Sequence, residues 1–582
     1  MDQLLRYIKK NRISLLFLGA IILLAAFLRL IYLERIPNAI GGDELTYILT
    51  IKSMVLTGHD MTGTWNPWSI LWFQYPYGQI QAELPYFLFA PVVGWSPFSL
   101  FTARITNAIV SIGIVILIYL ITKKIGNEKT ALFAGFLASI NPWFIYIGRT
   151  AYEVVPAMFF FLCIFYILLV VRKWKILLVI PFIILAFYSY IATKTILMPF
   201  LFLSILFVYL FVNKKKDGIY YSIIFFISFL LTIFYFFMTL MHPNATRIGE
   251  IFTPFSPMVT QEVNILRTAS IHSPFTALFI NKITMYIAII IAKVLNIFSF
   301  NYLFSTGDAF FSIWSHGLFY TLDIIFLIIG SVSLFLKQKR LFAFLWLFIA
   351  VGIIPHLIHV SNSDNFTPHI TLIFPFIIMI IAIGIETVVQ KIRQKSLHRI
   401  SRGVVIIVYL IMLGSFLNIY FYQFPLHGNF DFNTRVISNY VMRAADNDKK
   451  INIYTPRSAD IFSKYIFYAN IYKPSTAGEI KHIILSHNYN YGNIHFLSCD
   501  NKEKMKSQDI VYVYDAQCGK TVHTSSHIAT KTLFDGGDAF LIYHDTLCKN
   551  TTLKNYPTGI TLADFSLEKE GIEKFCSTYI FQ

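Results

Sequence analysis

Long apolar runs separated by short polar segments fill the first three quarters of the chain. Eleven runs are long enough to cross a hydrocarbon core of about 30 Å, and they lie near residues 13–33, 100–122, 130–148, 154–171, 175–193, 195–212, 219–241, 318–336, 341–360, 369–390 and 403–422. The pattern predicts a polytopic α-helical membrane protein with about 11 transmembrane helices. We interpret a further apolar run at 283–300, which contains Lys293, as an interfacial or re-entrant helix.

The basic residues between these runs favour one orientation of the chain. A cytoplasmic N-terminus puts every strongly basic loop on the cytoplasmic side, as the positive-inside rule requires, and these loops lie at 123–124, 172–175, 214–216, 337–340 and 391–402. Counting 283–300 as a span would reverse the later loops. The run at 13–33 has no small-residue cleavage motif, so we expect a retained first helix rather than a signal peptide.

The composition excludes other classes of protein. With 56% hydrophobic and 14% charged residues, a soluble chain of 582 residues could not bury its apolar surface. The formal net charge of +17 does not indicate a nucleic-acid-binding protein, because the Lys and Arg residues cluster in short loops rather than on one face or tail. We therefore expect a multi-pass protein of the cell membrane.

The same topology divides the chain into two parts. Residues 1–423 form a transmembrane module with long external loops at about 34–99 and 242–317. Residues 424–582 alternate helical stretches with short β-rich runs, which is typical of a small α/β domain, and the topology places this domain outside the cytoplasm. The β-rich runs lie at 451–454, 482–485, 494–497, 510–514 and 540–543.

Four of the five cysteines fall in the C-terminal domain, whereas Cys163 lies inside an apolar run. An even set in one region indicates two disulfides and an oxidising compartment; its members are Cys499, Cys518, Cys548 and Cys576. Three pairings are open, and we favour the sequential one. A zinc site is less favoured, because the sequence has no Cys-x-x-Cys or close Cys/His spacing.

Two adjacent carboxylates follow the first apolar run, in the sequence Gly41-Gly42-Asp43-Glu44-Leu45-Thr46-Tyr47. In a purely structural interpretation, Asp43 caps a helix over about 44–56 and Glu44 favours the positive end of its dipole. In a functional interpretation, carboxylates among aromatic rings at a membrane surface meet the polar head of an amphiphilic substrate. The neighbouring aromatic residues are Trp65, Trp68, Trp72, Tyr75, Tyr77 and Tyr86.

Cationic residues gather at the outer ends of the predicted spans. Arg29 and Arg104 lie near helix ends, where an arginine can simply extend toward headgroups. Arg149 and Glu153 are four residues apart and can form a local ion pair. Lys194 lies in a loop too short to reach far into water, which favours a contact with an anionic ligand.

The order of these motifs resembles the glycosyltransferase C superfamily, and more closely glycosyltransferase family 39, the protein O-mannosyltransferase and aminoarabinose-transferase group. The resemblance covers roughly residues 13–425. Its motifs are an Asp-Glu-x-x-Tyr sequence at 43–47, Asn-Pro-Trp at 141–143 followed by Arg-x-x-x-Glu at 149–153, and Tyr-Ser-Tyr at 188–190 followed by Lys194. The segments 300–308 and 315–317 are similar to a second pattern of the family. Pro368-His369 with Pro375 resembles a third, in which the arginine found in many members is absent here.

This resemblance implies transfer of a sugar, mannose or another hexose or pentose, from a polyprenyl-phosphate donor, with inversion on the extracytoplasmic face. Asp43 is then the general base that takes the acceptor's proton, and Glu44 orients the acceptor or a cation. Cations must stabilise the departing phosphate, and the candidates are Arg149 and Lys194, with Arg104 behind them. Supporting roles fall to Tyr47, Glu153, Asp308 and His316.

A divalent cation is a less favoured source of the same positive charge; its ligands would be Asp43, Glu44, Asp308 and His316 if their loops converge. The expected partners are the lipid-linked donor, a lipid, glycan or protein acceptor, and the bilayer, but no nucleic acid. The main alternative is a transporter or flippase for an amphiphilic anion, although repeated halves and deeply buried charges are not evident. A third is a non-catalytic scaffold whose C-terminal domain binds a partner.

Overall fold

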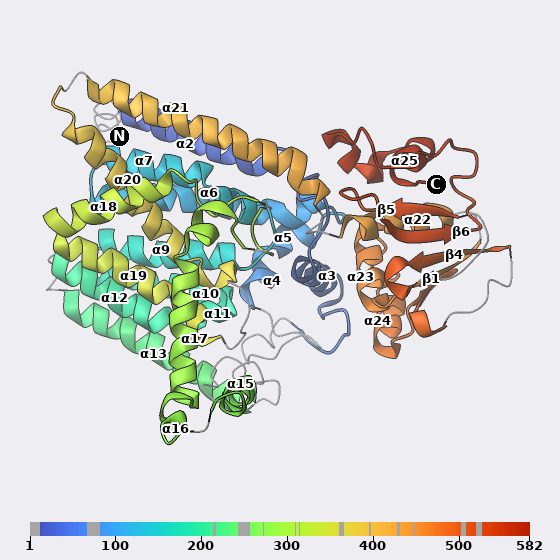
Figure 1. Ribbon diagram of the computed structural model, residues 1–582, viewed down its shortest axis with the longest axis horizontal. Coiled ribbons are helices and arrows are strands. Elements are labelled where there is room, and N and C mark those ends of the chain that lie inside the picture. The colour runs from blue at the N-terminus through green and yellow to red at the C-terminus, as the bar shows by residue number, and fades with distance from the viewer. Residues whose placement is uncertain are drawn as a thin grey trace.

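A computed structural model describes residues 12–66, 82–212, 217–241, 257–271, 273–308, 310–313, 315–359, 366–394, 397–427, 431–445, 449–501, 508–519 and 527–582. A bundle of helices forms the left-hand part of the molecule in Figure 1, and a mixed α/β domain forms the right-hand part. The C-terminus lies in the α/β domain.

Most helices of the bundle run along the long axis of the molecule (Figure 1). The bundle contains α2 (Arg12–Leu30), α6 (Leu100–Ile125), α7 (Glu128–Ile140), α8 (Pro142–Ile147), α9 (Val154–Val170), α10 (Val179–Ser189), α11 (Ile191–Lys194), α12 (Leu197–Phe211), α13 (Gly218–Met241), α18 (Asp323–Lys337), α19 (Lys339–Ile358), α20 (Ile373–Lys391) and α21 (Leu397–Asn418). Among the described residues, seven helices are long and apolar enough to cross a membrane, and α9 and α12 are apolar but shorter. The predicted class, a polytopic helical membrane protein, is confirmed; the count of about 11 spans and the orientation stay predictions.

Helix breaks divide two of the predicted runs. The run at 130–148 is split between α7 and α8, because Asn141 leaves the helical conformation and Pro142 begins a new helix whose Phe144 N–H donates to the Asn141 side chain. The run at 175–193 begins in a 3₁₀ helix (Lys173–Leu178), and α10 ends where Tyr190 becomes extended. Neither run forms one uninterrupted helix.

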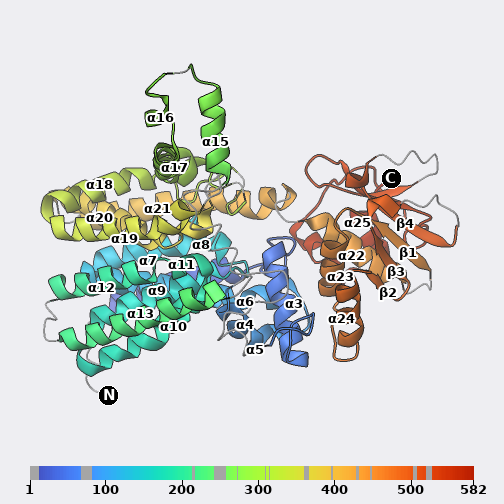
Figure 2. The same cartoon turned by 90° about the horizontal axis from the view of Figure 1, so that it is seen from below.

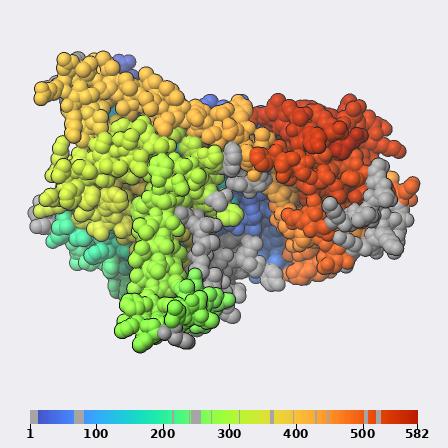
Figure 3. Space-filling view, viewed as in Figure 1, coloured from blue at the N-terminus to red at the C-terminus, as the bar shows by residue number. Residues whose placement is uncertain are grey.

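The helix α17 (Lys282–Ile297) lies across the other helices of the bundle. It is vertical in Figure 1 and is seen end-on in Figure 2. With α15 (Pro257–Thr268) and α16 (Thr276–Phe279) it stands out from the bundle surface (Figure 3). Lys293 anchors it by donating to the carbonyls of His356 and His359. The stretch Lys282–Ser305, which begins with α17, is one of the seven candidate spans by length and composition, and the interfacial or re-entrant helix stays a prediction.

Two glycines let α18 and α20 approach closely. A Cβ atom on Gly330 would overlap the carbonyl oxygen of Ile380, and one on Gly384 would overlap that of Phe326. Because neither glycine has a side chain, the two helices pack backbone to backbone. Most of α20 is buried by its neighbours, so this helix forms much of the core of the bundle.

Three helices of the long loop at about 34–99 lie at the end of the bundle that faces the α/β domain: α3 (Gly42–Thr57), α4 (Leu84–Leu88) and α5 (Ala90–Val93). The helix expected over about 44–56 is therefore confirmed as α3. It ends where Gly58 adopts the left-handed conformation and donates its N–H to Met54 O. Trp68, Trp72, Tyr75 and Tyr77 lie outside the described residues.

The C-terminal domain contains a six-stranded sheet with the order β2-β3-β1-β4-β6-β5. Its strands are β1 (Lys450–Tyr454), β2 (Asn490–Tyr491), β3 (Ile494–Leu497), β4 (Ile510–Asp515), β5 (Ile528–Lys531) and β6 (Asp538–Tyr543). The central strands β3, β1 and β4 are parallel, and the outer pairs are antiparallel. The accompanying helices are α22 (Phe432–Ala445), α23 (Ser458–Tyr468), α24 (Ala477–Ser486) and α25 (Ile572–Tyr579).

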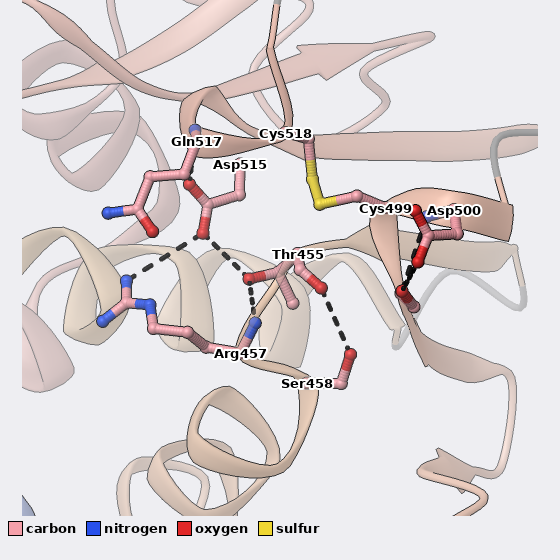
Figure 4. The surroundings of a disulfide bond; sticks show 9 residues. Thr455, Arg457, Ser458, Cys499, Asp500, Asp515, Gln517 and Cys518 are labelled. Atoms are coloured by element: carbon pink, nitrogen blue, oxygen red, sulfur yellow. Dashed lines mark hydrogen bonds and ion pairs between the residues drawn. A yellow bond between two sulfur atoms is a disulfide. The ribbon is translucent and has the colours of Figure 1, made fainter.

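The predicted α/β domain is confirmed, but one predicted strand is wrong. Residues 482–485 form the end of α24, because Ile480 and Ile483, three positions apart, face the core as a helix requires. The predicted sequential pairing of the cysteines is confirmed as Cys499–Cys518 and Cys548–Cys576. The first disulfide joins the segments that follow β3 and β4, next to Asp515 (Figure 4).

Candidate functional site

The two carboxylates of the Asp43-Glu44 pair have different environments. Glu44 is fully buried, and its carboxylate accepts hydrogen bonds from Gly41 N–H (2.9 Å) and Ala151 N–H (2.6 Å). Arg104 Nε lies 3.5 Å from the same carboxylate. Asp43 is exposed in the first turn of α3. Gly41 occupies the N-cap position, so the structural interpretation of the motif fits Glu44 rather than Asp43.

Arg104 and Arg149, two of the predicted phosphate ligands, are fully buried against backbone carbonyls. Arg104, on α6, donates to Pro37 O at 2.7 Å and Ala39 O at 2.6 Å. Arg149, which follows α8, donates to Leu28 O (3.0 Å), Ile36 O (2.9 Å) and the Tyr420 hydroxyl (3.0 Å). Buried carbonyls need such donors, so both arginines fix the loop that precedes α3.

Lys194, the third predicted phosphate ligand, lies at the end of α11 and is buried. Its ammonium donates to both oxygens of Glu83, at 2.6 and 2.8 Å. It also lies over three aromatic rings, with 4.5 Å to the Tyr235 centroid, 5.3 Å to Phe187 and 5.6 Å to Tyr188. The sequence prediction missed Glu83, although it is the only carboxylate between residues 61 and 127.

Tyr47 connects the start of α3 to the residue before Glu83. Its hydroxyl accepts the N–H of Ala82 at 2.9 Å, and its ring contacts that of Tyr86 at 5.2 Å between centroids. Burial, followed by the nearby charge of Glu153, raises the pKa of Tyr47 well above its ordinary value. Tyr47 therefore stays a neutral phenol, and Glu153, directly before α9, is near enough for its charge to act on it.

Asp308 and His316 have structural partners of their own. The carboxylate of Asp308 accepts the N–H of Phe310 (2.8 Å) and both the N–H and hydroxyl of Thr367 (2.8 and 2.7 Å), which ties the segment before α18 to the segment before α20. The His316 ring packs edge-on against Phe416, 5.1 Å between centroids.

The metal-ligand set predicted from the sequence is not assembled. In the part of the chain that the structure describes, no group of three or more His, Cys, Asp or Glu side chains is arranged to hold a metal ion. Asp308 is engaged with backbone N–H groups and Thr367, whereas the Glu44 carboxylate is held by Arg104 and the Gly41 N–H. We therefore assign no metal to these residues.

Comparisons with known proteins give a distant likeness of fold. No family model matches the chain, and no curated protein sequence matches it. The structure is similar to the archaeal oligosaccharyltransferase AglB from Archaeoglobus fulgidus in complex with an inhibitory peptide and a dolichol-phosphate, at 14% identity and a TM-score of 0.45, over 88% of this chain and 70% of that one. It is also similar to ArnT from Cupriavidus metallidurans bound to undecaprenyl phosphate, at 11% identity and a TM-score of 0.43, over 91% and 98% of the two chains.

The resemblance to the glycosyltransferase C superfamily rests on the sequence motifs. The resemblance to family 39 stays a prediction. Because the likeness is distant, the function proposed below rests on the arrangement of this chain's own side chains.

Proposed function

We propose that this chain is a membrane glycosyltransferase that moves a sugar from a polyprenyl-phosphate donor to a lipid, glycan or protein acceptor on the extracytoplasmic face, with inversion. The observation that carries the proposal is the difference in exposure between the two adjacent carboxylates. Glu44 is fully buried, while Asp43 beside it is exposed. A general base must be accessible to the acceptor and held by an ordered backbone, and Asp43 meets both conditions.

In this reaction the acceptor oxygen attacks the anomeric carbon, and the bond from that carbon to the phosphate oxygen breaks. Asp43 takes the proton of the attacking hydroxyl, an effect typically worth about 10²–10⁴-fold in rate. The leaving group is an anion, and a cation beside it stabilises the charge that develops in the transition state. Lys194 is the proposed contact for this phosphate.

Lys194 suits this role better than the two arginines do. Its partner Glu83 is itself an anion, so a phosphate can replace one negative charge by another. The aromatic rings around the ammonium offer an apolar surface for a sugar face or the first units of a polyprenyl chain. Arg104 and Arg149 contribute by holding the loop before Asp43 and by their positive charge behind it.

The test uses the purified protein in lipid, with radiolabelled sugars on undecaprenyl and dolichyl phosphate and a crude membrane or peptide acceptor mixture. These carriers are chosen because the two similar structures hold them. Replacement of the base by Asp43→Asn should lower sugar transfer at least about a hundredfold, within the range for losing a general base. Asp538→Asn, an exposed aspartate on β6, is the matched control and should leave transfer unchanged.

Two other results would change the proposal in different ways. Transfer that survives Asp43→Asn would keep the enzyme class but reject Asp43 as the base. No transfer by the folded wild-type protein from any donor would favour the transporter or flippase, in which the buried cations bind a moving substrate.

A further inference from the structure

The loop that leads to Asp43, residues 36–41, is held by both parts of the molecule. Arg149 and Arg104 from the helical bundle bind three of its carbonyls. The carbonyl of Asn38, between these residues, accepts a hydrogen bond from Arg435 Nη1 of α22 at 2.5 Å. The N–H of Ile40 donates to the Tyr468 hydroxyl at the end of α23, at 3.0 Å. Successive loop residues are thus fixed from the bundle and from the C-terminal domain.

Arg435 is well placed to hold its carbonyl rigidly. The side chain is almost fully buried, and Nε and Nη2 donate to the two oxygens of Glu568 at 2.7 and 2.6 Å. Nη2 also donates to Phe565 O at 3.0 Å. Such a bidentate pair fixes the plane of the guanidinium, so Nη1 points at Asn38 without freedom to turn away. Glu568 itself lies inside the segment closed by the Cys548–Cys576 disulfide.

Tyr468 fixes the other side of the same loop. It lies at the end of α23, which packs between α3 and the sheet in both views of the ribbon (Figures 1 and 2). Its ring is buried, and Arg435 lies 5.8 Å from the ring centroid. Tyr468 and Arg435 therefore form one unit of the C-terminal domain directed at the loop.

The position of this loop decides the position of the proposed base. Asp43 follows Ile40 by three residues, and the N–H of Gly41 is bonded to Glu44 in the first turn of α3. A shift of the loop therefore moves the start of the helix that carries Asp43. For a reacting group, a displacement of about 1 Å can cost on the order of a hundredfold in rate.

We propose that the C-terminal domain positions the base of the reaction, and that Arg435 and Tyr468 are its positioning residues. The inference rests on the proposed function, in which Asp43 is that base. It assigns a role to a domain for which the sequence suggests no chemistry: the domain holds the loop of the bundle instead of touching the substrate.

The chain offers closely matched controls for both residues. Tyr472 also reaches across the same interface, but its hydroxyl meets Ser53 Oγ (2.6 Å), nearly three turns beyond Asp43 on α3. Arg443 lies two turns after Arg435 on α22 and donates to the carbonyls of Leu567 and Glu570, without contact to the loop. Tyr472→Phe and Arg443→Ala therefore remove comparable bonds but leave residues 36–41 in place.

The first measurement is amide hydrogen exchange of the full-length protein in lipid, read for the peptide that covers 38–45. Tyr468→Phe removes only the acceptor of the Ile40 N–H, so exchange there should rise about fivefold to tenfold, as expected for one hydrogen bond. Arg435→Ala should raise it further. Tyr472→Phe and Arg443→Ala should leave it unchanged.

The second measurement is sugar transfer with the donor that is active in the Asp43 experiment. Tyr468→Phe and Arg435→Ala should lower kcat, by about tenfold and on the order of a hundredfold respectively, while KM for the donor changes less than about twofold because no donor contact is lost. Arg435→Lys, which keeps the charge but not the planar fork, should be intermediate.

Either of two results would overturn this inference: exchange of 38–45 that is unchanged in Tyr468→Phe, or a rise in exchange with no fall in kcat. The exchange measurement needs no substrate, so it judges the contact with the loop even where Arg435→Ala fails to fold. Absence of transfer by the wild type, or transfer that survives Asp43→Asn, counts instead against the proposed function.

Discussion

Two regions at the same end of the bundle bury cations in opposite ways. In the clamped loop (residues 36–41 with Arg104, Arg149 and Arg435), all four loop carbonyls from Ile36 to Ala39 accept hydrogen bonds from guanidinium groups. In the Lys194 site (Lys194, Glu83 and the surrounding rings), the cation meets a carboxylate. A phosphate that took an arginine from the loop would leave buried carbonyls without donors, whereas at Lys194 it would exchange one anion for another.

The difference separates rigidity from ligand exchange. The clamped loop is suited to hold a base in place, and the Lys194 site is suited to accept and release an anion. Tyr47 joins the two regions, because it stands on α3 and its hydroxyl accepts the N–H of the residue before Glu83. One buried phenol thus sets the proposed base and the proposed phosphate contact relative to one another.

The prediction with the largest expected effect concerns the clamped loop. Arg149→Ala removes donors from Leu28 O and Ile36 O, and two buried carbonyls left without partners should cost roughly 2–6 kcal/mol of stability. The measurement is the apparent Tm of the purified protein in lipid, with Arg340→Ala, an exposed arginine, as the control. An unchanged Tm together with a raised donor KM would place Arg149 on the phosphate and break the comparison.

The next prediction concerns the Lys194 site. The paired change Lys194→Met with Glu83→Gln removes both charges, so that neither is left buried alone. We expect kcat/KM for the donor to fall roughly 10–100-fold, the range for losing hydrogen bonds from a charged group to an anion, with only a small change in Tm.

Lys52 provides the matched control for that prediction. It is another buried lysine, but it donates to the carbonyls of Gly94 (3.0 Å) and Ser96 (2.8 Å). Lys52→Met should therefore lower Tm without changing the donor kcat/KM. Equal effects of both changes on kcat/KM would mean that Lys194 has no special relation to the donor.

A single change at Glu83 should have a smaller effect of the opposite sign, a lower KM for the donor. Glu83→Gln alone keeps the shape of the side chain but removes the anion that competes for Lys194. We expect KM for the donor to fall about threefold to tenfold, because the phosphate no longer displaces a charge-assisted partner. A rise in KM would show instead that Glu83 orients Lys194 for the donor.

The sequence predicted what depends on local pattern. Long apolar runs predicted a helical membrane protein, the start of α3 was expected at Asp43-Glu44, and strand-like runs with four cysteines indicated the C-terminal domain and its disulfides. The partners of the buried cations could not be predicted in this way. Lys194 meets Glu83 across 111 residues and Arg435 meets Asn38 across 397, so only the packed fold brings these groups together.

The smallest expected effect concerns pH and the support of the clamped loop. Burial alone would raise the pKa of Glu568, but the paired Arg435 guanidinium, with other hydrogen bonds, holds it below its ordinary value of about 4.5. A carboxylate with a lowered folded-state pKa contributes stability that is present above the unfolded-state pKa and is lost as the pH falls through the folded-state value.

Glu568→Gln should thus lower Tm at pH 7, and the difference from wild type should shrink below pH about 4.5. The side chain is 34% exposed, so solvent screening keeps the effect small. A Tm difference that stays constant from pH 7 to the acid limit would mean that the ionised pair does not stabilise this support.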